Sequence, residues 1–209
     1  MPLPNRLVLQ ILLITLALAA GVPVHAAGDP ARGQELAYTC LGCHGIPGYK
    51  NVYPTYSVPE LYGQHPEYII AALKAYKSGE RSHATMHQQA ASLSDQDMAD
   101  IASYLGSQPL KASSAPVGSA PVKAALCASC HGKNGVGITG DYPTLAGQHA
   151  DYLARALNEY AHGDRKNPIM PNFVTGLTAA DIKEIAHYFS EQSPPLETVP
   201  RRQTFLSSN

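Results

Sequence analysis

Apolar positions at helical spacing predict two long amphipathic helices. Apolar and tyrosine residues recur at three- and four-residue intervals over residues 65–78 and again over residues 149–162. A glycine follows each stretch, Gly79 in one case and Gly163 in the other, and glycine is the usual residue just past a helix C-terminus. Because no stretch alternates convincingly between apolar and polar residues, we predict an all-α fold.

Further helices are indicated by residues that cap helix N-termini. Asp29 precedes Pro30, a pairing typical of an N-cap followed by the first helical position. Late in each half, a Ser or Thr is followed three residues later by an Asp, in the manner of a capping box. These pairs are Ser94 with Asp97 and Thr178 with Asp181.

The chain contains an internal repeat. Residues 58–108 align without gaps on residues 142–192, and 18 of the 51 aligned positions are identical. A long repeat present once in each half indicates two copies of one fold. We therefore predict two domains, residues 27–108 and residues 120–193.

Two segments outside the repeat are predicted to be extended. Residues 109–119 are rich in Pro, Ser, Ala and Gly, a composition typical of a linker between domains. Residues 194–209 begin with two prolines and show no periodicity, so we predict an extended C-terminal tail.

Residues 1–26 are typical of a secretory signal peptide. A positively charged start precedes an apolar run of 14 residues from Leu7 to Ala20, and small residues suit cleavage after Ala26 or the residue that follows it. The alternative is a retained membrane anchor, but the run is shorter than the roughly 20 residues that span a bilayer. We expect a periplasmic protein whose mature chain has no membrane span, with loose membrane association left open.

Composition excludes one class of function and points to a bound cofactor. The chain has 15 Lys and Arg against 16 Asp and Glu, and this near-balance excludes a strongly basic nucleic-acid binder. Trp is absent and Phe occurs 3 times, so two domains have few large apolar side chains for their cores. A large cofactor would supply the missing apolar bulk.

Each half contains the pattern C-x-x-C-H, which attaches haem c covalently. Cysteines three residues apart lie on one face of a helical turn, where both can form thioethers with one porphyrin edge. The histidine that follows then points its imidazole at the iron. We predict two covalently attached haem c groups. The copies of the pattern are Cys40, Cys43 and His44 in the first half and Cys127, Cys130 and His131 in the second.

Two other uses of a C-x-x-C pair stay open at this point. A redox-active disulfide usually sits in a thioredoxin-like βαβ pattern, which surrounds neither copy. A zinc ion held by both pairs would need residues of two domains to converge, although each pair already has its own histidine. Two matched copies in an exported chain favour haem.

A six-coordinate haem iron needs a second axial ligand opposite the histidine. Met86 and Met170 occupy the same position of the repeat, in segments that we predict to be turn-rich and free of helix. We predict that His44 and Met86 bind one iron, and that His131 and Met170 bind the other. The methionine sulfur and the imidazole then saturate each iron.

Four further histidines need an assignment. His83 and His87 flank Met86 and could compete with it for the iron, or they are exposed loop residues. His65 and His149 repeat at the start of the two long helices, where we predict a capping or haem-edge hydrogen-bonding role.

Repeated arginines and tyrosines also point toward the haem. Arg81 and Arg165 could pair with a haem propionate or could be solvated. Tyr68 and Tyr152 are predicted to pack on the haem from a helix face, with their hydroxyls available for hydrogen bonds.

The whole mature chain resembles the dihaem class I cytochromes of the cytochrome c4 type. The resemblance implies two class I cytochrome c domains related by a pseudo-twofold axis, with the haem propionates facing each other across the domain interface. It also implies that the backbone carbonyls of Pro59 and Pro143 accept the Nδ1 protons of His44 and His131. It is carried by the paired C-x-x-C-H patterns, the P-x-L-x-G-Q motifs of residues 59–64 and 143–148, the Met segments, and the final helices ending in Tyr104-Leu105 and Tyr188-Phe189.

Histidine and methionine ligation leaves no position on the iron for a substrate, which favours electron transfer over catalysis. We therefore expect a monomeric carrier without catalytic residues. It would take electrons from a quinol-oxidising membrane complex or a dehydrogenase and deliver them to a terminal oxidase through transient contacts with these partner proteins. Two alternatives are a cytochrome subunit of a larger dehydrogenase, such as a flavocytochrome, and a dihaem peroxidase with a displaceable ligand.

Overall fold

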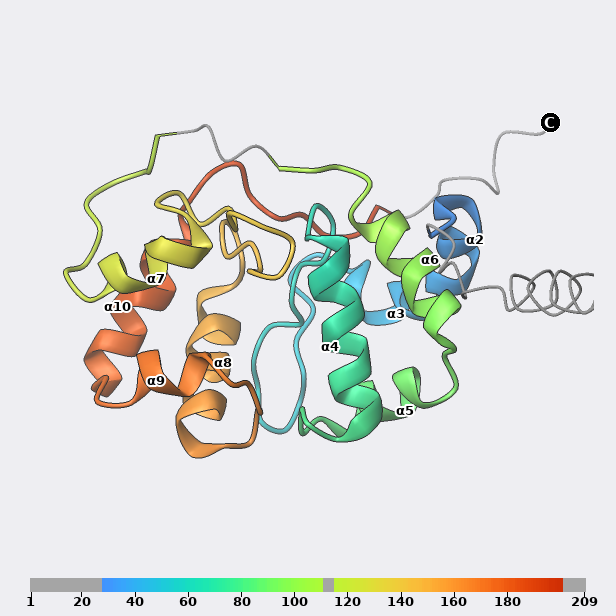
Figure 1. Cartoon of the computed structure of the whole chain (residues 1–209), viewed down its shortest axis with the longest axis horizontal. Helices are drawn as coiled ribbons and strands as arrows, with labels where there is room; N and C mark the ends of the chain where they lie inside the picture. The colour runs from blue at the N-terminus through green and yellow to red at the C-terminus, as the bar shows by residue number, and fades with distance from the viewer. Residues whose placement is uncertain (1–27, 111–114, 201–209) are drawn as a thin grey trace, which may run out of the picture.

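The computed structural model describes residues 28–110 and 115–200 of the chain. The predicted signal peptide and part of the predicted linker lie outside these residues. The described helices form two groups that lie side by side, α2 to α6 in the first domain and α7 to α10 in the second (Figure 1). Among the described residues, no helix is both long enough and apolar enough to cross a membrane.

The prediction of an all-α fold is confirmed, because the described residues form helices joined by loops and only isolated β-bridges. The first domain contains α2 (Pro30–Leu36), the short 3-10 helix η1 (Ala37–Thr39), α3 (Leu41–His44), α4 (Pro66–Ser78), α5 (Ala84–Ala91) and α6 (Asp95–Leu105). The second contains α7 (Ala124–His131), α8 (Ala150–His162), α9 (Met170–Val174) and α10 (Ala179–Ser190).

The helix ends follow the predicted local signals. Asp29 caps α2, and its carboxylate accepts the backbone N–H of Ala31 at 2.9 Å. Complete capping boxes open α6 and α10. Gly79 and Gly163 end the two long helices with φ angles of 83° and 82°, a left-handed conformation that glycine adopts without strain.

The first domain is closed by the packing of α2 against α6. A Cβ atom on Gly33 would lie 1.9 Å from the backbone oxygen of Asp100, so glycine is required at this crossing. The buried carboxylate of Asp100 accepts the backbone N–H of Asp29 at 2.8 Å and pairs with Arg32. In the second domain the repeat has Ala120 in place of Gly33, and no helix precedes α7 among the described residues of that domain.

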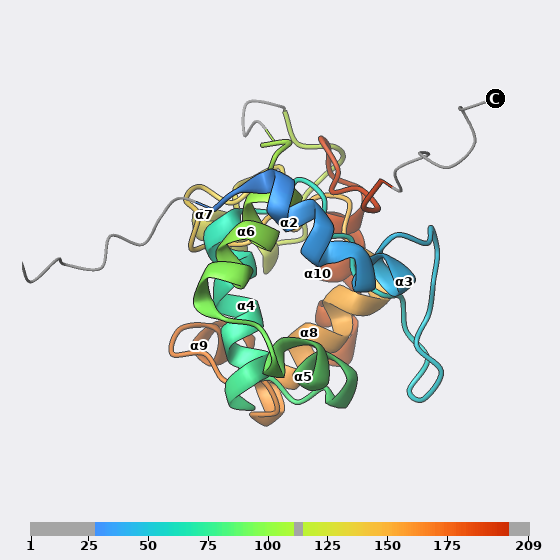
Figure 2. The ribbon, with the colours of Figure 1, turned by 90° about the vertical axis from the view of Figure 1, so that its right-hand side faces the viewer.

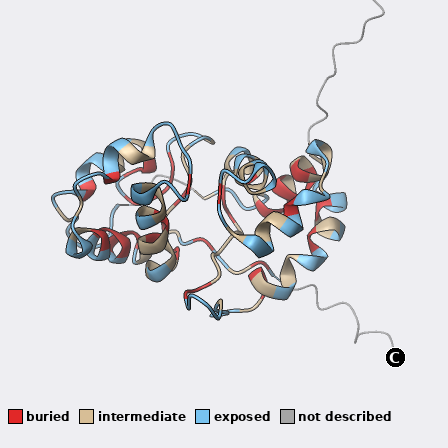
Figure 3. Cartoon of the chain, turned by 90° about the horizontal axis from the view of Figure 1, so that it is seen from below, coloured by how far each residue is buried: buried red, intermediate tan, exposed pale blue. Residues whose placement is uncertain are grey.

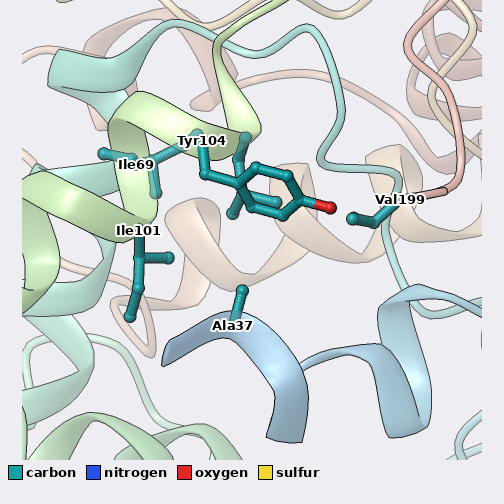
Figure 4. Close-up of a cluster of buried hydrophobic side chains, with 7 residues drawn as sticks. Ala37, Ile69, Ile101, Tyr104 and Val199 are labelled. Carbon is teal, nitrogen blue, oxygen red and sulfur yellow. The ribbon is translucent and has the colours of Figure 1, made fainter. Parts of the chain in front are cut away.

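Each domain has its own small apolar core, and the core of the first domain includes a residue that follows the second domain in the sequence. In the first domain, Ile101 and Tyr104 of α6 pack with Ala37 and Ile69. Val199 completes this cluster and is only 1% exposed, although it belongs to the segment that follows the second domain (Figure 4). Buried positions occur in both domains and in the loop segments between them (Figure 3).

The described part of the predicted C-terminal tail is extended and crosses from the second domain to the first (Figure 1). We call residues 194–200 the strap. Tyr62 and Glu197 exchange two backbone hydrogen bonds of 3.0 Å, so the strap pairs with the loop before α4. Leu196, buried in the same segment, anchors the strap on the second domain through a 2.8 Å hydrogen bond to the carbonyl of Ala146.

The two domains meet through hydrogen bonds that repeat at the spacing of the sequence repeat. Gln64 donates to the carbonyl of Thr144 at 2.9 Å and accepts its N–H at 2.8 Å. Gln148 makes the same two bonds with the backbone of Glu60, at 2.9 and 3.0 Å. Because each partner lies 84 residues from its counterpart, the interface has the predicted pseudo-twofold symmetry.

Candidate cofactor sites

In the first domain, the C-x-x-C-H pattern lies on the turn that forms α3. His44 ends this helix with its imidazole buried, and its Nδ1–H donates to the backbone carbonyl of Pro59 at 2.8 Å. Burial lowers the pKa of His44, so the ring is neutral at physiological pH. With the proton held on Nδ1, the lone pair of Nε2 is available to a metal.

The second domain repeats this arrangement at the end of α7. The buried imidazole of His131 donates its Nδ1–H to the carbonyl of Pro143 at 2.9 Å. Burial lowers the pKa of His131 as well, which keeps the ring neutral. Both halves therefore present one neutral imidazole of fixed tautomer beside a cysteine pair.

The cysteines do not have the properties of a redox-active pair. No disulfide links the four cysteines, all of which lie in the described part of the chain. Burial raises the pKa of the Cys40 and Cys127 thiols, whereas a reactive cysteine needs a lowered pKa. Within residues 28–110 and 115–200, no group of three or more His, Cys, Asp and Glu side chains is placed to hold a metal ion.

A large cavity brings together the ligands predicted for the first haem; most of its lining comes from the first domain and the rest from the second. His44 and Met86 both line it, as do Cys40 and Cys43. Its empty volume is about 1450 Å³, including the part that opens to solvent, and most of its other lining residues are apolar. The helices α2, α4, α5 and α6 are arranged around this region (Figure 2). A cavity of this size and character can take a flat apolar macrocycle.

The prediction that Met86 lies in a helix-free segment is wrong. Met86 belongs to α5, whose residues include helix-forming Ala, Met and Gln. His83 is the N-cap, and its Nδ1 accepts the backbone N–H of Met86 at 3.2 Å. His83 is therefore half-buried above the first turn of α5 and is not an exposed loop residue.

Met170 also lies in a helix, at the first position of α9, so the same prediction is wrong for the second domain. The N-cap of this short helix is Ile169, whose side chain makes no capping bond, but the side chain of Asn167 accepts the backbone N–H of Met170 at 2.9 Å. Pro171 follows at a position of the first turn where proline is tolerated.

Two buried arginines face each other where the domains meet. Arg81 and Arg165 form an isolated bridge through their backbones, and both donate to the hydroxyl of Tyr68, at 2.7 and 3.1 Å. The alternative that they are solvated is therefore wrong. Burial alone would raise the pKa of the Tyr68 hydroxyl, but the two guanidinium groups lower it to about 8.

These arginines need an anionic partner. Among the described residues, no carboxylate lies within ion-pair distance of Arg81 or Arg165, and the buried Nε of Arg165 has no hydrogen-bond partner there. Buried charges are normally paired, because burying an unpaired charge costs about several kcal/mol of folding free energy. The carboxylates of a haem would satisfy both groups, so the described residues fit haem.

His65 and His149 occupy the N-cap positions of α4 and α8, but their side chains do not cap these helices. They reach across the domain interface instead. His65 Nε2 lies 3.2 Å from the carbonyl oxygen of Gly137, and His149 Nε2 lies 3.1 Å from Glu60 Oε1. Sequence reasoning missed Glu60, although it stands opposite Thr144 within two otherwise matching P-x-L-x-G-Q motifs.

Comparison with known proteins agrees with this geometry. The sequence model of the cytochrome c family matches residues 30–109 and 117–193. Cytochrome c4 of Pseudomonas aeruginosa is 36% identical over 196 residues, covering 85% of this chain and 96% of the relative. The thiosulfate dehydrogenase electron acceptor of Stutzerimonas stutzeri is 31% identical, covering 84% of this chain and 93% of the relative. The solved structure of reduced cytochrome c4 from Pseudomonas stutzeri superposes with a TM-score of 0.62 at 30% identity, covering 79% of this chain and all of that one.

Proposed function

Because this chain belongs to the cytochrome c family, with one such domain and one covalently bound haem c in each half, we propose that it is a periplasmic two-haem carrier that links a dehydrogenase or quinol-oxidising complex to a terminal oxidase. When bound, the haem supplies reversible one-electron chemistry at its iron. The chain's own residues decide how the haem is held, how far water is excluded and which partners it meets.

The proposed attachment assigns each cysteine pair to one haem. Cys40 and Cys43 hold the first haem through thioethers, and Cys127 and Cys130 hold the second. His44 and Met86 would hold the iron of the first haem, and His131 and Met170 would hold that of the second. The carbonyls of Pro59 and Pro143 keep the Nδ1 protons in place, which fixes each imidazole and increases its basicity toward the iron.

Two features of the site support transfer of electrons over catalysis. A histidine and a methionine would hold each haem iron from opposite sides, which would leave no coordination site open to a substrate. The apolar lining around His44 and Met86 excludes water and lets the iron change charge with little rearrangement. The buried guanidinium groups of Arg81 and Arg165 would bind haem propionates, which supports haems that lie close to the domain interface.

The proposed redox partners are supported by the named relatives and by the exposed surface of the second domain. Relatives named as electron acceptors of thiosulfate dehydrogenase support a dehydrogenase as the donor. Exposed apolar side chains flank the second C-x-x-C-H pattern, with Val122 and Leu126 at 92% and 65% exposure. A small apolar surface next to a haem suits the weak, brief docking that electron transfer requires.

The observation that carries this proposal is the shared cavity of His44 and Met86, with the imidazole neutral and its tautomer fixed. Carbon monoxide binding to the reduced holoprotein tests it, because the gas needs an open position on the iron. We expect no spectral change at neutral pH in the wild type and binding to one haem in Met170→Ala. Strong binding by the wild type would favour the peroxidase alternative.

The alternative of a cytochrome subunit of a larger dehydrogenase needs a separate measurement. Size-exclusion chromatography of the native protein, isolated without denaturation, distinguishes the two functions. A carrier elutes at the mass of one chain with two haems. Stable co-elution with a flavoprotein or another catalytic chain would contradict the proposed function.

A further inference from the structure

Glu60 breaks the symmetry of the domain interface. It and Thr144 occupy the same position of the two P-x-L-x-G-Q motifs, and the backbone of each pairs with a glutamine of the other domain at nearly equal distances. The two positions therefore differ in their side chains alone. One presents a carboxylate and the other a small hydroxyl.

The carboxylate of Glu60 is held in place from two sides. Its Oε1 accepts the hydroxyl proton of Thr198, from the strap, at 2.9 Å and lies 3.1 Å from His149 Nε2, from α8. The side chain of Glu60 is only 13% exposed. In contrast, the buried hydroxyl of Thr144 has no hydrogen-bond partner among the described residues. The carboxylate of Glu60 is therefore held by side-chain contacts that the hydroxyl of Thr144 lacks.

Glu60 belongs to the surroundings of the first haem. It directly follows Pro59, whose carbonyl binds the imidazole of His44, whereas Thr144 follows Pro143, whose carbonyl binds the imidazole of His131. Glu60 also lines the cavity of His44 and Met86, which Thr144 borders from the second domain. A negative charge that is largely removed from water acts over a longer distance than an exposed one. It favours the ferric iron over the ferrous iron, because the oxidised site carries one more positive charge.

Other charges near Glu60 set the conditions under which this effect is visible. Protonated His149 offsets the carboxylate, and His149 itself faces Asp151 and Lys50, which lie 3.7 Å apart. Removing Glu60 would also release the proton of His149 over a middle pH range, and the two changes would partly cancel. Because Glu60 raises the pKa of His149, the comparison is made on the alkaline side, at pH 8.5, where less of that proton is left to be released.

We propose that Glu60 sets the reduction potential of the first haem, holding it below the value that the same site would have with the threonine of the second domain. Glu60 does not touch the iron ligands in this role; it acts through its charge, fixed by Thr198 and His149. The inference rests on the proposed function, because it requires two haems that are reduced reversibly.

The test is a redox titration of the complete holoprotein with Glu60→Gln at pH 8.5. Glutamine keeps the size and a hydrogen-bond acceptor but removes the charge. We expect the reduction equilibrium of one haem to change at least threefold in favour of the ferrous state. At 59 mV per decade for one electron, this raises its midpoint potential by about 28 mV or more. The other midpoint should stay where it is. The same titration in a Met170→His background, which lowers the second haem's potential, assigns the moving midpoint to the first haem.

A reciprocal variant and a partner variant complete the test. Thr144→Glu places a carboxylate next to Pro143, whose carbonyl binds His131, and should lower the second midpoint more than the first. His149→Gln removes the offsetting cation, so it should lower the first midpoint at pH 5.5 and leave it unchanged at pH 8.5. Both variants are read out as midpoint potentials. A merely structural role of Glu60 would not shift these potentials.

The outcomes separate this inference from the proposed function. If the wild type shows two reversible one-electron steps and Glu60→Gln moves neither midpoint, or moves both equally, the role of Glu60 is wrong and the carrier function stands. If the wild type lacks two reversible steps, the carrier function itself is wrong. Intact mass and the methionine–iron charge-transfer band of each variant verify that both haems and their ligands are retained.

Discussion

The backbone N–H of Val199 donates to the carbonyl oxygen of His44 at 3.1 Å. This bond joins the strap, which follows the second domain, to the proposed haem ligand of the first. The side chain of Val199 fills the core next to Tyr104 and Ala37 (Figure 4). The first domain is therefore completed by residues that lie at the far end of the chain.

Val199→Ala should destabilise the first domain. The substitution removes two buried carbons and leaves a cavity, which costs about 1.5–3 kcal/mol in a well-packed core. Thermal unfolding of the holoprotein, followed by the absorbance of the haems and by circular dichroism, measures the loss. Val117→Ala, at a residue that is 49% exposed, is the matched control and should change stability by less than about 0.5 kcal/mol. Equal stability of the two variants would show that the strap contributes nothing.

Gln64→Ala should weaken the domain interface. It removes a buried side chain that both donates to and accepts from the backbone of Thr144, so a buried N–H and a buried carbonyl lose their partners. Each unsatisfied buried group costs roughly 1–3 kcal/mol. Denaturant unfolding gives the difference, and Gln88→Ala, at an exposed position of α5, serves as the control. A loss no larger than that of the control would contradict the role of the paired glutamines.

The contact between His149 and Glu60 predicts a dependence of stability on pH. The hydrogen bond and charge of Glu60 raise the pKa of His149 above its ordinary value of 6.5. A raised pKa in the folded state means that the contact stabilises the fold fully below pH 6.5 and that this contribution is lost as the pH rises through the folded pKa. The contribution of this contact to the free energy of unfolding should therefore fall between pH 5 and pH 9, against the opposite trend that the lowered pKa values of His44 and His131 produce.

Matched variants isolate this contribution. His149→Gln should remove the fall in stability on the alkaline side of pH 6.5, whereas His162→Gln, at an exposed position of the same helix, should keep it. A pH profile of His149→Gln that superposes on the wild type would rule out the contact as its source.

Arg165→Gln should lower the reduction potential of at least one haem. The buried guanidinium of Arg165 is a positive charge beside the domain interface, and a positive charge favours the ferrous iron. We expect a shift of at least threefold in the reduction equilibrium by redox titration. Lys166→Gln, at the exposed neighbouring residue, removes a charge that water screens, and its shift should be smaller. The reverse order would mean that Arg165 does not face the haems.

Much of the fold could be predicted because its causes are local. Asp29 and the capping boxes mark helix starts through neighbours two or three residues away, and Gly79 marks a helix end through its own backbone conformation. The C-x-x-C-H pattern is also local, since its chemistry needs a single helical turn. Because the sequence repeats, the elements of the second domain could then be predicted from those of the first.

The features that sequence reasoning missed depend on contacts between distant residues. Nothing near Val199 indicates that it fills the core of the other domain, because its partners lie about 100 residues or more away. The burial of Arg81 follows from the approach of the second domain, which residue spacing does not encode. The helix at Met86 was missed for a different reason, because its cap is a histidine rather than one of the usual N-cap residues.

The most direct test of the central claim is an absorbance-monitored redox titration that includes the methionine–iron charge-transfer band. If each domain holds a haem between histidine and methionine, the wild type will show two reversible one-electron steps. The band will lose about half its intensity in Met170→Ala and the rest when Met86→Ala is added. A wild type with a single step, or a band that survives both substitutions unchanged, would contradict the ligation of both haems and with it the proposed function.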